Sequence, residues 1–303
     1  IKDRQPEAWR KLEHLNGSGT ENAVLERLTK TLESKEGGTV NVIRRGFSIA
    51  GAGNIAMSQA LPEDERNESV LKKYAANRLR VVSQLRYSFD KSDEIDLAFF
   101  INGLPVATVE LKTDFTQCVE AAMHQYRKDR PPKSEKTGLP EPLLTFKRGA
   151  VVHFAMSDSD IRMTTKLAGD KTFLLPFNKG NDGAIGNPPG ENGQYPVSYF
   201  WQQVLQRDNW LRIFRRFILI ETKKEEDING RTYFKQNLIF PRYHQWEAVT
   251  KIIDTVRDEG VGQPYLIQHS AGSGKTNTIS WTAHELIRLR QSDGEPYFNS
   301  VIV

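Results

Sequence analysis

The chain has 303 residues, of which 38% are hydrophobic and 26% charged, with a net charge of +4. This composition fits one or two globular domains, and its mildly basic balance permits nucleic-acid binding without requiring it. The single cysteine, Cys118, excludes a disulfide framework and a zinc site built from cysteines. No apolar run approaches the roughly 18 residues of a membrane span and no signal peptide opens the chain, so we expect a cytoplasmic protein with no membrane partner.

The first 130 residues are expected to form helices around a group of strands. Residues 7–35 and 62–77 have the spacing of amphipathic helices, whereas 39–50 and 79–88 look like strands. Another helix is expected at 117–129. This order predicts an α/β fold in which a mixed β-sheet core is flanked by helices.

Residues 94–112 (EIDLAFFINGLPVATVELK) form the most informative stretch of the chain and predict a β-hairpin. Val, Ile, Phe and Thr fill two runs that suit a pleated, half-buried surface, and Asn102-Gly103 supplies the positive φ angles of a tight turn. Three charged residues, Asp96, Glu110 and Lys112, project from this otherwise apolar segment. Since an unpaired buried charge costs several kcal/mol, we expect them to meet water, a metal ion or each other.

The length of the turn decides whether the two acids of the hairpin can meet. A two-residue turn at 102–103 would set Asp96 opposite Val109, on the wrong face of the hairpin. A three-residue turn at 102–104 would set Asp96 opposite Glu110, with Cβ atoms roughly 4.5–5.5 Å apart. We therefore predict the turn of odd length.

Such a pair of carboxylates suits phosphodiester hydrolysis. Asp96 and Glu110 would share Mg²⁺, which prefers oxygen ligands and lowers the pKa of a bound water. Lys112 would stabilise the attacking hydroxide or the charge that develops on phosphorus. The alternative is an exposed hairpin with a cross-strand charge cluster, because short motifs arise often by chance. Cys118, His153 and His269 match no ligand spacing.

The middle of the chain carries few chemical signals. A strand is expected at 150–156, a short hairpin at 160–173, and a loop or boundary in the Gly-, Pro- and Asn-rich residues 178–196. A helix is expected at 198–219, followed by a polar linker over 221–234. The basic face of that helix carries Arg207, Arg212, Arg215 and Arg216, which could meet DNA phosphates or simply be solvated.

A glycine-rich motif near the end of the chain predicts a nucleotide-binding loop. A short apolar strand at 265–268 leads into HSAGSGKT at 269–276, and a helix is expected over 277–290. The pattern departs from the full motif because His269 stands where the first glycine is usual. About thirty residues upstream, Gln245 could hydrogen-bond an adenine edge, which favours ATP over GTP.

The loop residues have distinct expected roles. Backbone N–H groups would wrap the phosphates, Lys275 would reach the β and γ phosphates, and Thr276 would hold Mg²⁺. The residues expected to bind the nucleotide are Gln245, Gly272, Ser273, Gly274, Lys275 and Thr276. No acidic strand that would activate water follows before the last residues, so we expect ATP binding but poor hydrolysis, and a piece of a longer protein.

A nuclease hairpin followed by an ATP loop resembles the restriction (motor) subunit of type I restriction endonucleases. The resemblance rests on residues 94–112, on FPRYHQ at 240–245 and on HSAGSGKT with the NTISWTAHEL that follows it. It implies three parts: a PD-(D/E)xK-like nuclease domain at 1–177, a connecting region at 178–235, and the start of a RecA-like P-loop translocase domain at 236–303. The chain lacks the Pro that usually precedes the first acid of the nuclease motif.

The resemblance also implies site residues, partners and a mechanism. It makes Asp96 and Glu110 metal ligands, Lys112 the catalytic lysine and Tyr126 a further catalytic residue, although Gln125 and Tyr126 are adjacent and not spaced as Gln-x-x-x-Tyr. An acid on the first helix, Glu21 or Glu26, often assists. The partners would be double-stranded DNA and the methylation and specificity subunits, with cleavage following ATP-driven translocation. The alternatives are a DNA-repair helicase-nuclease that trims ends and a non-catalytic, nucleotide-dependent scaffold.

Overall fold

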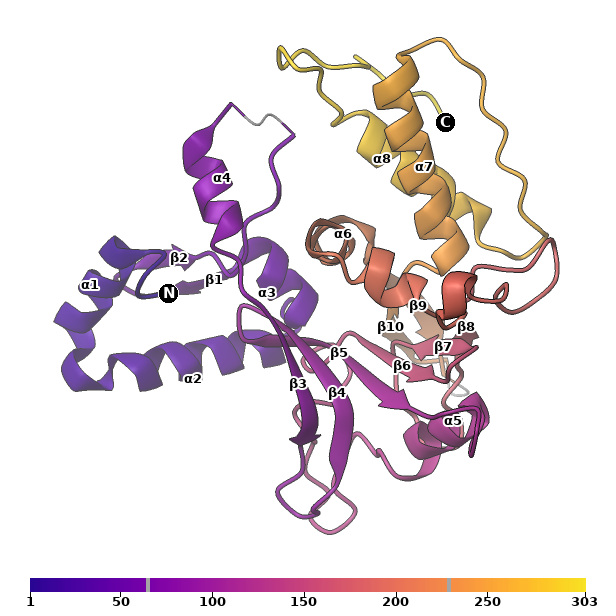
Figure 1. Ribbon diagram of the computed structural model, residues 1–303. Helices are drawn as coiled ribbons and strands as arrows, with labels where there is room; N and C mark the ends of the chain where they lie inside the picture. Colours follow the sequence, from indigo (N-terminus) through magenta and orange to yellow (C-terminus); the bar gives the residue numbers. More distant parts are fainter. Residues whose placement is uncertain (64–65, 228–229) are drawn as a thin grey trace.

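The computed structural model describes residues 1–63, 66–227 and 230–303, and its centre is a six-stranded sheet (Figure 1). The strand order is β3-β4-β5-β6-β7-β8, and only the β5–β6 pair is parallel. The strands are β3 (Leu79–Arg86), β4 (Glu94–Ile101), β5 (Leu104–Leu111), β6 (Val152–Met156), β7 (Ile161–Thr164) and β8 (Leu175–Pro176). Helices flank this sheet, so the predicted mixed α/β core is confirmed.

The β4–β5 hairpin reaches the predicted pairing by a different route. Its turn contains only Asn102 and Gly103, with φ angles of 52° and 89°, so the predicted three-residue turn is wrong. The register instead shifts by one residue between Phe99 and Phe100, where Val106 is the extra residue of β5. This β-bulge corrects the register, because it pairs Leu97 with Val109 and so sets Asp96 across from Glu110.

Two helices open the chain and a third replaces a predicted strand. The expected helix at 7–35 is divided into α1 (Pro6–Asn16) and α2 (Thr20–Glu33) by the turn η1 (Gly17–Gly19). The strand prediction at 39–50 is wrong for its first half, which forms α3 (Thr39–Arg45) between two glycines of positive φ. Most of its β-branched residues pack into the core, and tertiary packing of this kind overrides their weak strand preference. The next elements are β1 (Phe47–Ile49), β2 (Gly53–Ile55) and α4 (Glu68–Ala75).

The other predictions for the first two thirds of the chain agree broadly with the structure. Helix α5 (Val119–Lys128) and strand β6 lie where helix and strand were expected, and β7 pairs with β8 as a short hairpin. Within residues 178–196 the structure describes only the turn η2 (Glu191–Gly193) as regular structure.

The predicted helix at 198–219 is broken in three. Two π-helical turns, η3 (Phe200–Val204) and η4 (Ile213–Phe217), flank the short helix α6 (Arg207–Arg212). Gln206 has an extended backbone (φ −57°, ψ 139°), and this ends the first segment. The break lets large side chains on both segments point into one core.

The predicted linker at 221–234 is wrong for most of its described residues, which belong to a hairpin of β9 (Leu219–Glu226) and β10 (Thr232–Ile239). Residues 228–229 of that prediction lie outside the described residues. Both strands are exposed along much of their length, so no alternation of polar and apolar residues marks them in the sequence. Cross-strand charge pairs help to hold them, with Lys235 Nζ 3.1 Å from Glu225 Oε1.

The last part of the chain contains α7 (Tyr243–Glu259) and α8 (Lys275–Leu286), which pack together at the top of Figure 1. The strand predicted at 265–268 is absent: these described residues run without a strand partner, and Leu266 is 91% exposed. A RecA-like sheet is therefore not seen in the described residues 236–303. Among the helices that the structure describes, none is long and apolar enough to cross a membrane.

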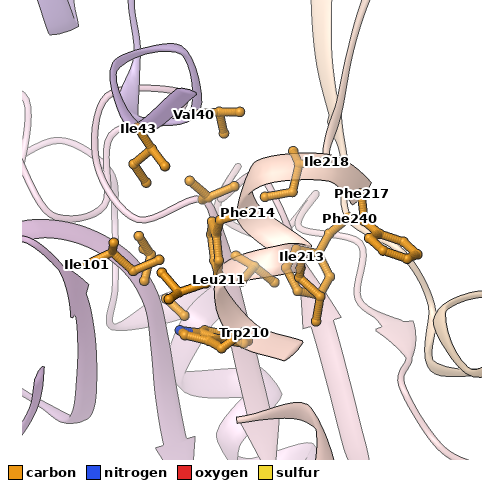
Figure 2. Close-up of a cluster of buried hydrophobic side chains, with 14 of the residues drawn as sticks. Val40, Ile43, Ile101, Trp210, Leu211, Ile213, Phe214, Phe217, Ile218 and Phe240 are labelled. Carbon is orange, nitrogen blue, oxygen red and sulfur yellow. The ribbon is translucent and has the colours of Figure 1, made fainter. Parts of the chain in front are cut away.

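A single large hydrophobic core joins the sheet to the segment at 200–217 (Figure 2). Trp210 packs edge-to-face on Phe214 with ring centroids 4.9 Å apart, and Phe240, directly after β10, joins the cluster. A second, smaller core lies beneath α5 and includes Tyr126 and Ala155. Since Phe99 of β4 contacts Trp210 while Thr108 of β5 contacts Tyr126, the two cores lie on opposite faces of the sheet.

Replacing Phe214 with Ala is expected to destabilise the protein by about 3–5 kcal/mol, because it opens a cavity at the centre of the larger core. Urea unfolding followed by tryptophan fluorescence measures this change. Phe89→Ala is the control: Phe89 is 97% exposed, and its removal should change stability by less than about 0.5 kcal/mol. Equal effects of the two substitutions would contradict the central place of Phe214 in this core.

Candidate active site

Asp96 and Glu110 meet where the β4–β5 hairpin begins to open. Leu111 N donates to Asp96 Oδ2 over 2.7 Å, so the aspartate side chain takes the place of a strand carbonyl. One residue later, Lys112 N donates to Met156 O of β6 over 2.8 Å. Strand β5 pairs with β4 on one side and β6 on the other, and its pairing with β6 continues beyond Val109, where its pairing with β4 ends. The carboxylate of Asp96 fills the gap that opens between β4 and β5.

The two acids share the face of the sheet that α5 covers. Ala98 pairs with Thr108, whose hydroxyl lies 2.8 Å from the Tyr126 hydroxyl on α5. Because side chains two residues apart on a strand share a face, Asp96 and Glu110 also lie on the α5 face. Lys112 follows Glu110 by two residues and is partly exposed.

The carboxylate of Glu110 is fully buried, and only one of its two oxygens has a hydrogen-bond partner among the described residues. Its Oε1 accepts a hydrogen bond of 2.7 Å from Arg130 Nε, whereas its Oε2 has no partner among the described residues. Burial is the largest cause that raises the pKa of Glu110; Arg130 lowers it and the nearby Asp96 raises it, and the net result is a pKa of about 7. An unsatisfied buried oxygen beside a second carboxylate is a position that a cation would stabilise.

Arg130 was not predicted from the sequence. It follows α5, and its side chain is 7% exposed. Besides Glu110, it donates to Glu94 O over 2.8 Å and lies over the ring of Tyr87 at 5.8 Å. Arginine offers several donors in a fixed plane, so this one side chain holds Glu110 to the start of β4. The Asp-Arg-Pro sequence at the end of a helix was the only signal of it, and it is a weak one.

The donor set of this site fits a hard divalent cation. The Oε2 atom of Glu110 and the carboxylate of Asp96 supply oxygen ligands, and Mg²⁺ typically takes one or two carboxylates and keeps several waters. No group of three or more His, Cys, Asp or Glu residues able to hold a metal occurs in the part of the chain that the structure describes. Any cation here would therefore depend on these two acids and on water.

The other predicted assistants occupy different places. Tyr126 is fully buried, and its hydroxyl bonds to Thr108, which also contacts His153 Nδ1 at 2.7 Å. Burial raises the pKa of Tyr126 well above its usual value and lowers that of His153 to about 3, so both are neutral. Glu21 and Glu26 are exposed on α2, at the opposite side of Figure 1 from α5.

Among the described residues near α5, no group of three or more His, Cys, Asp and Glu residues could hold zinc. Cys118 is an exposed free thiol just before α5. The Oε1 atom of Gln125 is buried with no hydrogen-bond partner among the described residues.

The candidate nucleotide loop precedes α8. Gly272 and Gly274 have φ angles of 72° and 83°, which glycine adopts without strain. Lys275 Nζ donates to the carbonyl oxygens of His269 and Ser270 over 3.2 and 2.9 Å, so the lysine lies across the loop that it would use to bind phosphate.

Gln245 of α7 hydrogen-bonds to the backbone of this loop. Its Nε2 donates to Ser273 O and Gly274 O over 3.2 and 3.0 Å, and its Oε1 accepts from Arg242 N over 2.9 Å. Both ends of the amide therefore have partners within the chain. Contact with adenine stays a prediction, and it would require at least one of these bonds to be exchanged.

The fold and site define a class of protein: a mixed α/β domain in which the β4–β5 hairpin presents two acids and a lysine near a flanking helix. A family model described as the type I restriction enzyme R protein N terminus matches residues 2–172. This match covers more than half of the chain and includes Asp96, Glu110, Lys112 and Arg130. The chain belongs to this family, which confirms the resemblance seen in its sequence. No curated protein matches it.

The raised pKa of Glu110 predicts a pH-dependent contribution to folding. The Glu110 carboxyl binds a proton more tightly in the folded protein (pKa about 7) than in the unfolded chain (usual pKa 4.5). Proton binding therefore stabilises the folded state fully below about pH 4.5, and this stabilisation is lost as the pH rises through 7. In EDTA, the stability of the wild type relative to Glu110→Gln should fall between pH 5 and pH 8 by up to about 3 kcal/mol. Urea unfolding at the two pH values measures this difference.

The exposed carboxylate variant Glu21→Gln is the control, and its stability relative to the wild type should be the same at both pH values. If Glu110→Gln behaved like this control, Glu110 would not be buried as the structure shows.

Proposed function

We propose that Asp96, Glu110 and Lys112 form the active site of an endonuclease that hydrolyses phosphodiester bonds of double-stranded DNA with the help of Mg²⁺. The observation that supports it most directly is the unsatisfied Oε2 of Glu110 beside Asp96, in a chain whose family is that of type I restriction enzyme R subunits. Family membership supports nuclease activity in general. The metal, the residues and their roles are our proposal.

Each residue has a part that follows from its position. Asp96 and Glu110 would hold the cation, which when bound polarises the phosphate and supplies an activated water. Lys112, partly exposed and two residues after Glu110, would place its ammonium against the charge that grows on phosphorus. Arg130 orients Glu110 by binding Oε1, which leaves Oε2 available to hold the cation.

Tyr126 was predicted to be catalytic, and a direct role stays a prediction. Its buried hydroxyl bonds to Thr108, two residues before Glu110 on the same face of β5. This geometry supports a role in positioning β5 against α5 more than contact with a substrate.

The second half of the proposal concerns ATP. The glycine loop, Lys275 and Thr276 at the start of α8 would bind the phosphates and their Mg²⁺, and the chain would contribute to an ATP-driven translocase with a RecA-like first domain. Within the complete enzyme, methylation and specificity subunits would choose the DNA target, because nuclease contacts to the phosphate backbone carry no sequence information. Such a complex would act in the cytoplasm.

Substitutions in the hairpin should separate metal binding from chemistry. Asp96→Asn and Glu110→Gln should lose both Mn²⁺ binding, measured by calorimetry, and Mg²⁺-dependent plasmid cleavage, by at least about a hundredfold. Lys112→Ala should still bind Mn²⁺ but lose cleavage to a similar degree, since it acts on the phosphate. EDTA should stop cleavage by the wild type.

The control for these variants is Glu120→Gln, an exposed carboxylate on α5 that should leave both properties unchanged. Cleavage by all three hairpin variants at the rate of the wild type would overturn the nuclease proposal. Normal folding without any Mn²⁺ binding by the wild type would favour a structural hairpin in a nucleotide-dependent scaffold.

The loop before α8 is tested by Lys275→Ala. This change removes the only side-chain cation within the loop at 269–276 and should weaken binding of a fluorescent ATP analogue at least about tenfold. Lys251→Ala, on the exposed face of α7, should not change the affinity. An unchanged affinity of the Lys275 variant would show that the loop does not bind phosphate.

A further inference from the structure

The turn of the β4–β5 hairpin borders a groove of about 770 Å³ that neither the nuclease site nor the nucleotide loop uses. The groove lies between the hairpin turn, the start of β3, the segment before α1 and the first residue of α6. It is lined by four arginines, Arg4, Arg78, Arg80 and Arg207. Asp3 is the only acid among the lining residues, so the groove carries a formal charge of four minus one, or +3.

Two of the arginines, Arg4 and Arg207, are held in place mainly by uncharged partners. Arg207 donates to the carbonyl oxygens of Tyr74, Ala75 and Asn77 over 3.0–3.1 Å. Arg4 donates to the side chain of Asn102 in the turn. The one ion pair, between Arg78 and Asp3 at 3.6 Å, is about 80% exposed on both sides and is therefore weak.

Asn102 fixes this arrangement to the hairpin. Its Oδ1 accepts from Arg78 N over 2.7 Å, and its Nδ2 donates to Met57 O over 2.7 Å and to Asn77 Oδ1 over 3.0 Å. The groove is thus built before any ligand arrives. The pKa of Arg4 is lowered by burial and then by Arg78 and Arg207, which shows that like charges crowd this place. An anion would relieve that repulsion.

Part of the groove, around Arg80, lies on the same face of the sheet as the proposed nuclease site. Arg80 pairs with Phe100, and Phe100 lies four residues from Asp96 on the same side of β4. Four strand residues span about 13–14 Å, which matches the rise of about four base pairs at 3.4 Å per step. A duplex lying along β3 and β4 from the carboxylates would therefore bring backbone phosphates to the arginines.

We propose that this groove binds the phosphate backbone of double-stranded DNA about four base pairs from the phosphodiester that Asp96 and Glu110 cleave. The inference rests on the proposed nuclease function, which it extends by giving the path of the substrate. Guanidinium groups suit this ligand, because they form paired hydrogen bonds to phosphate oxygens. Arg78 and Arg80 are exposed to solvent, and Arg78 has only the weak ion pair with Asp3 to exchange for a phosphate. Arg4 and Arg207 are half-buried and shape the groove.

Arg78→Gln/Arg80→Gln tests the proposal. Binding of the chain to a fluorescent 30-base-pair duplex is measured by anisotropy, without Mg²⁺, between 50 and 200 mM salt. We expect the Kd of this variant to rise about tenfold at 100 mM salt, and the slope of log K against log salt to fall by about two, one for each lost phosphate contact. The matched control is Lys223→Gln/Lys224→Gln on β9, which removes two exposed charges outside the groove and should keep the slope of the wild type.

Arg78→Lys/Arg80→Lys should restore most of the affinity, which a loss of structure would not explain. A wild-type slope in the Gln variant, or an equal loss in the β9 control, would overturn the proposal. A variant that binds DNA normally but no longer binds polyglutamate would overturn it in favour of an acidic protein partner. The two proposals can fail separately. If Glu110→Gln abolishes plasmid cleavage while Arg78→Gln/Arg80→Gln binds and cuts DNA normally, the groove proposal fails and the nuclease proposal stands. A wild type that neither binds nor cuts DNA refutes both.

Discussion

The burial of the Glu110 carboxylate beside Arg130 is the constraint around which this site is organised. A fully buried acid is costly, and its raised pKa of about 7 shows that a single hydrogen bond to Arg130 does not remove the cost. The surrounding elements hold the acid there nonetheless: β5 carries it, the segment after α5 supplies Arg130, and Arg130 in turn holds the start of β4. A protein that needed only stability would place an apolar residue at this position, so the retained acid favours a functional explanation.

The opening of the β4–β5 hairpin gives this acid its partner. Strand β5 leaves β4 at Leu111 to continue beside β6, and Asp96 occupies the resulting gap by accepting from Leu111 N. The bulge at Val106 is what aligns Asp96 with Glu110, and bulges near functional sites commonly redirect side chains in this way. At the other end of the same hairpin, Asn102 organises the basic groove. One supersecondary unit thus carries both the candidate chemistry and the candidate contact to the DNA backbone.

Ion pairs connect the nuclease-like sheet with the helix that follows the candidate nucleotide loop. Arg212 and Arg216, from the segment packed on the sheet, bind Glu285 near the end of α8, and Arg216 also binds Glu63. The helix that begins at Lys275 is therefore attached to the sheet through charged groups that are largely buried. The larger hydrophobic core also extends from Trp9 to Leu289, so the nuclease-like sheet and the helices near the nucleotide loop share packing.

The class of fold, the family and the three charged residues of the hairpin are all predictable from sequence, because each depends on local pattern: β-branched runs, an Asn-Gly turn, a glycine loop before a helix. Sequence patterns misjudged α3 and the β9–β10 hairpin, where packing and strand pairing override local preference. The register of the hairpin depends on the bulge at Val106, which the Asn-Gly turn does not encode because the bulge arises in the pairing of β4 with β5. The tertiary structure alone also revealed Arg130 beside Glu110 and the four arginines of the groove, because these residues are distant in sequence and meet only when the chain is folded.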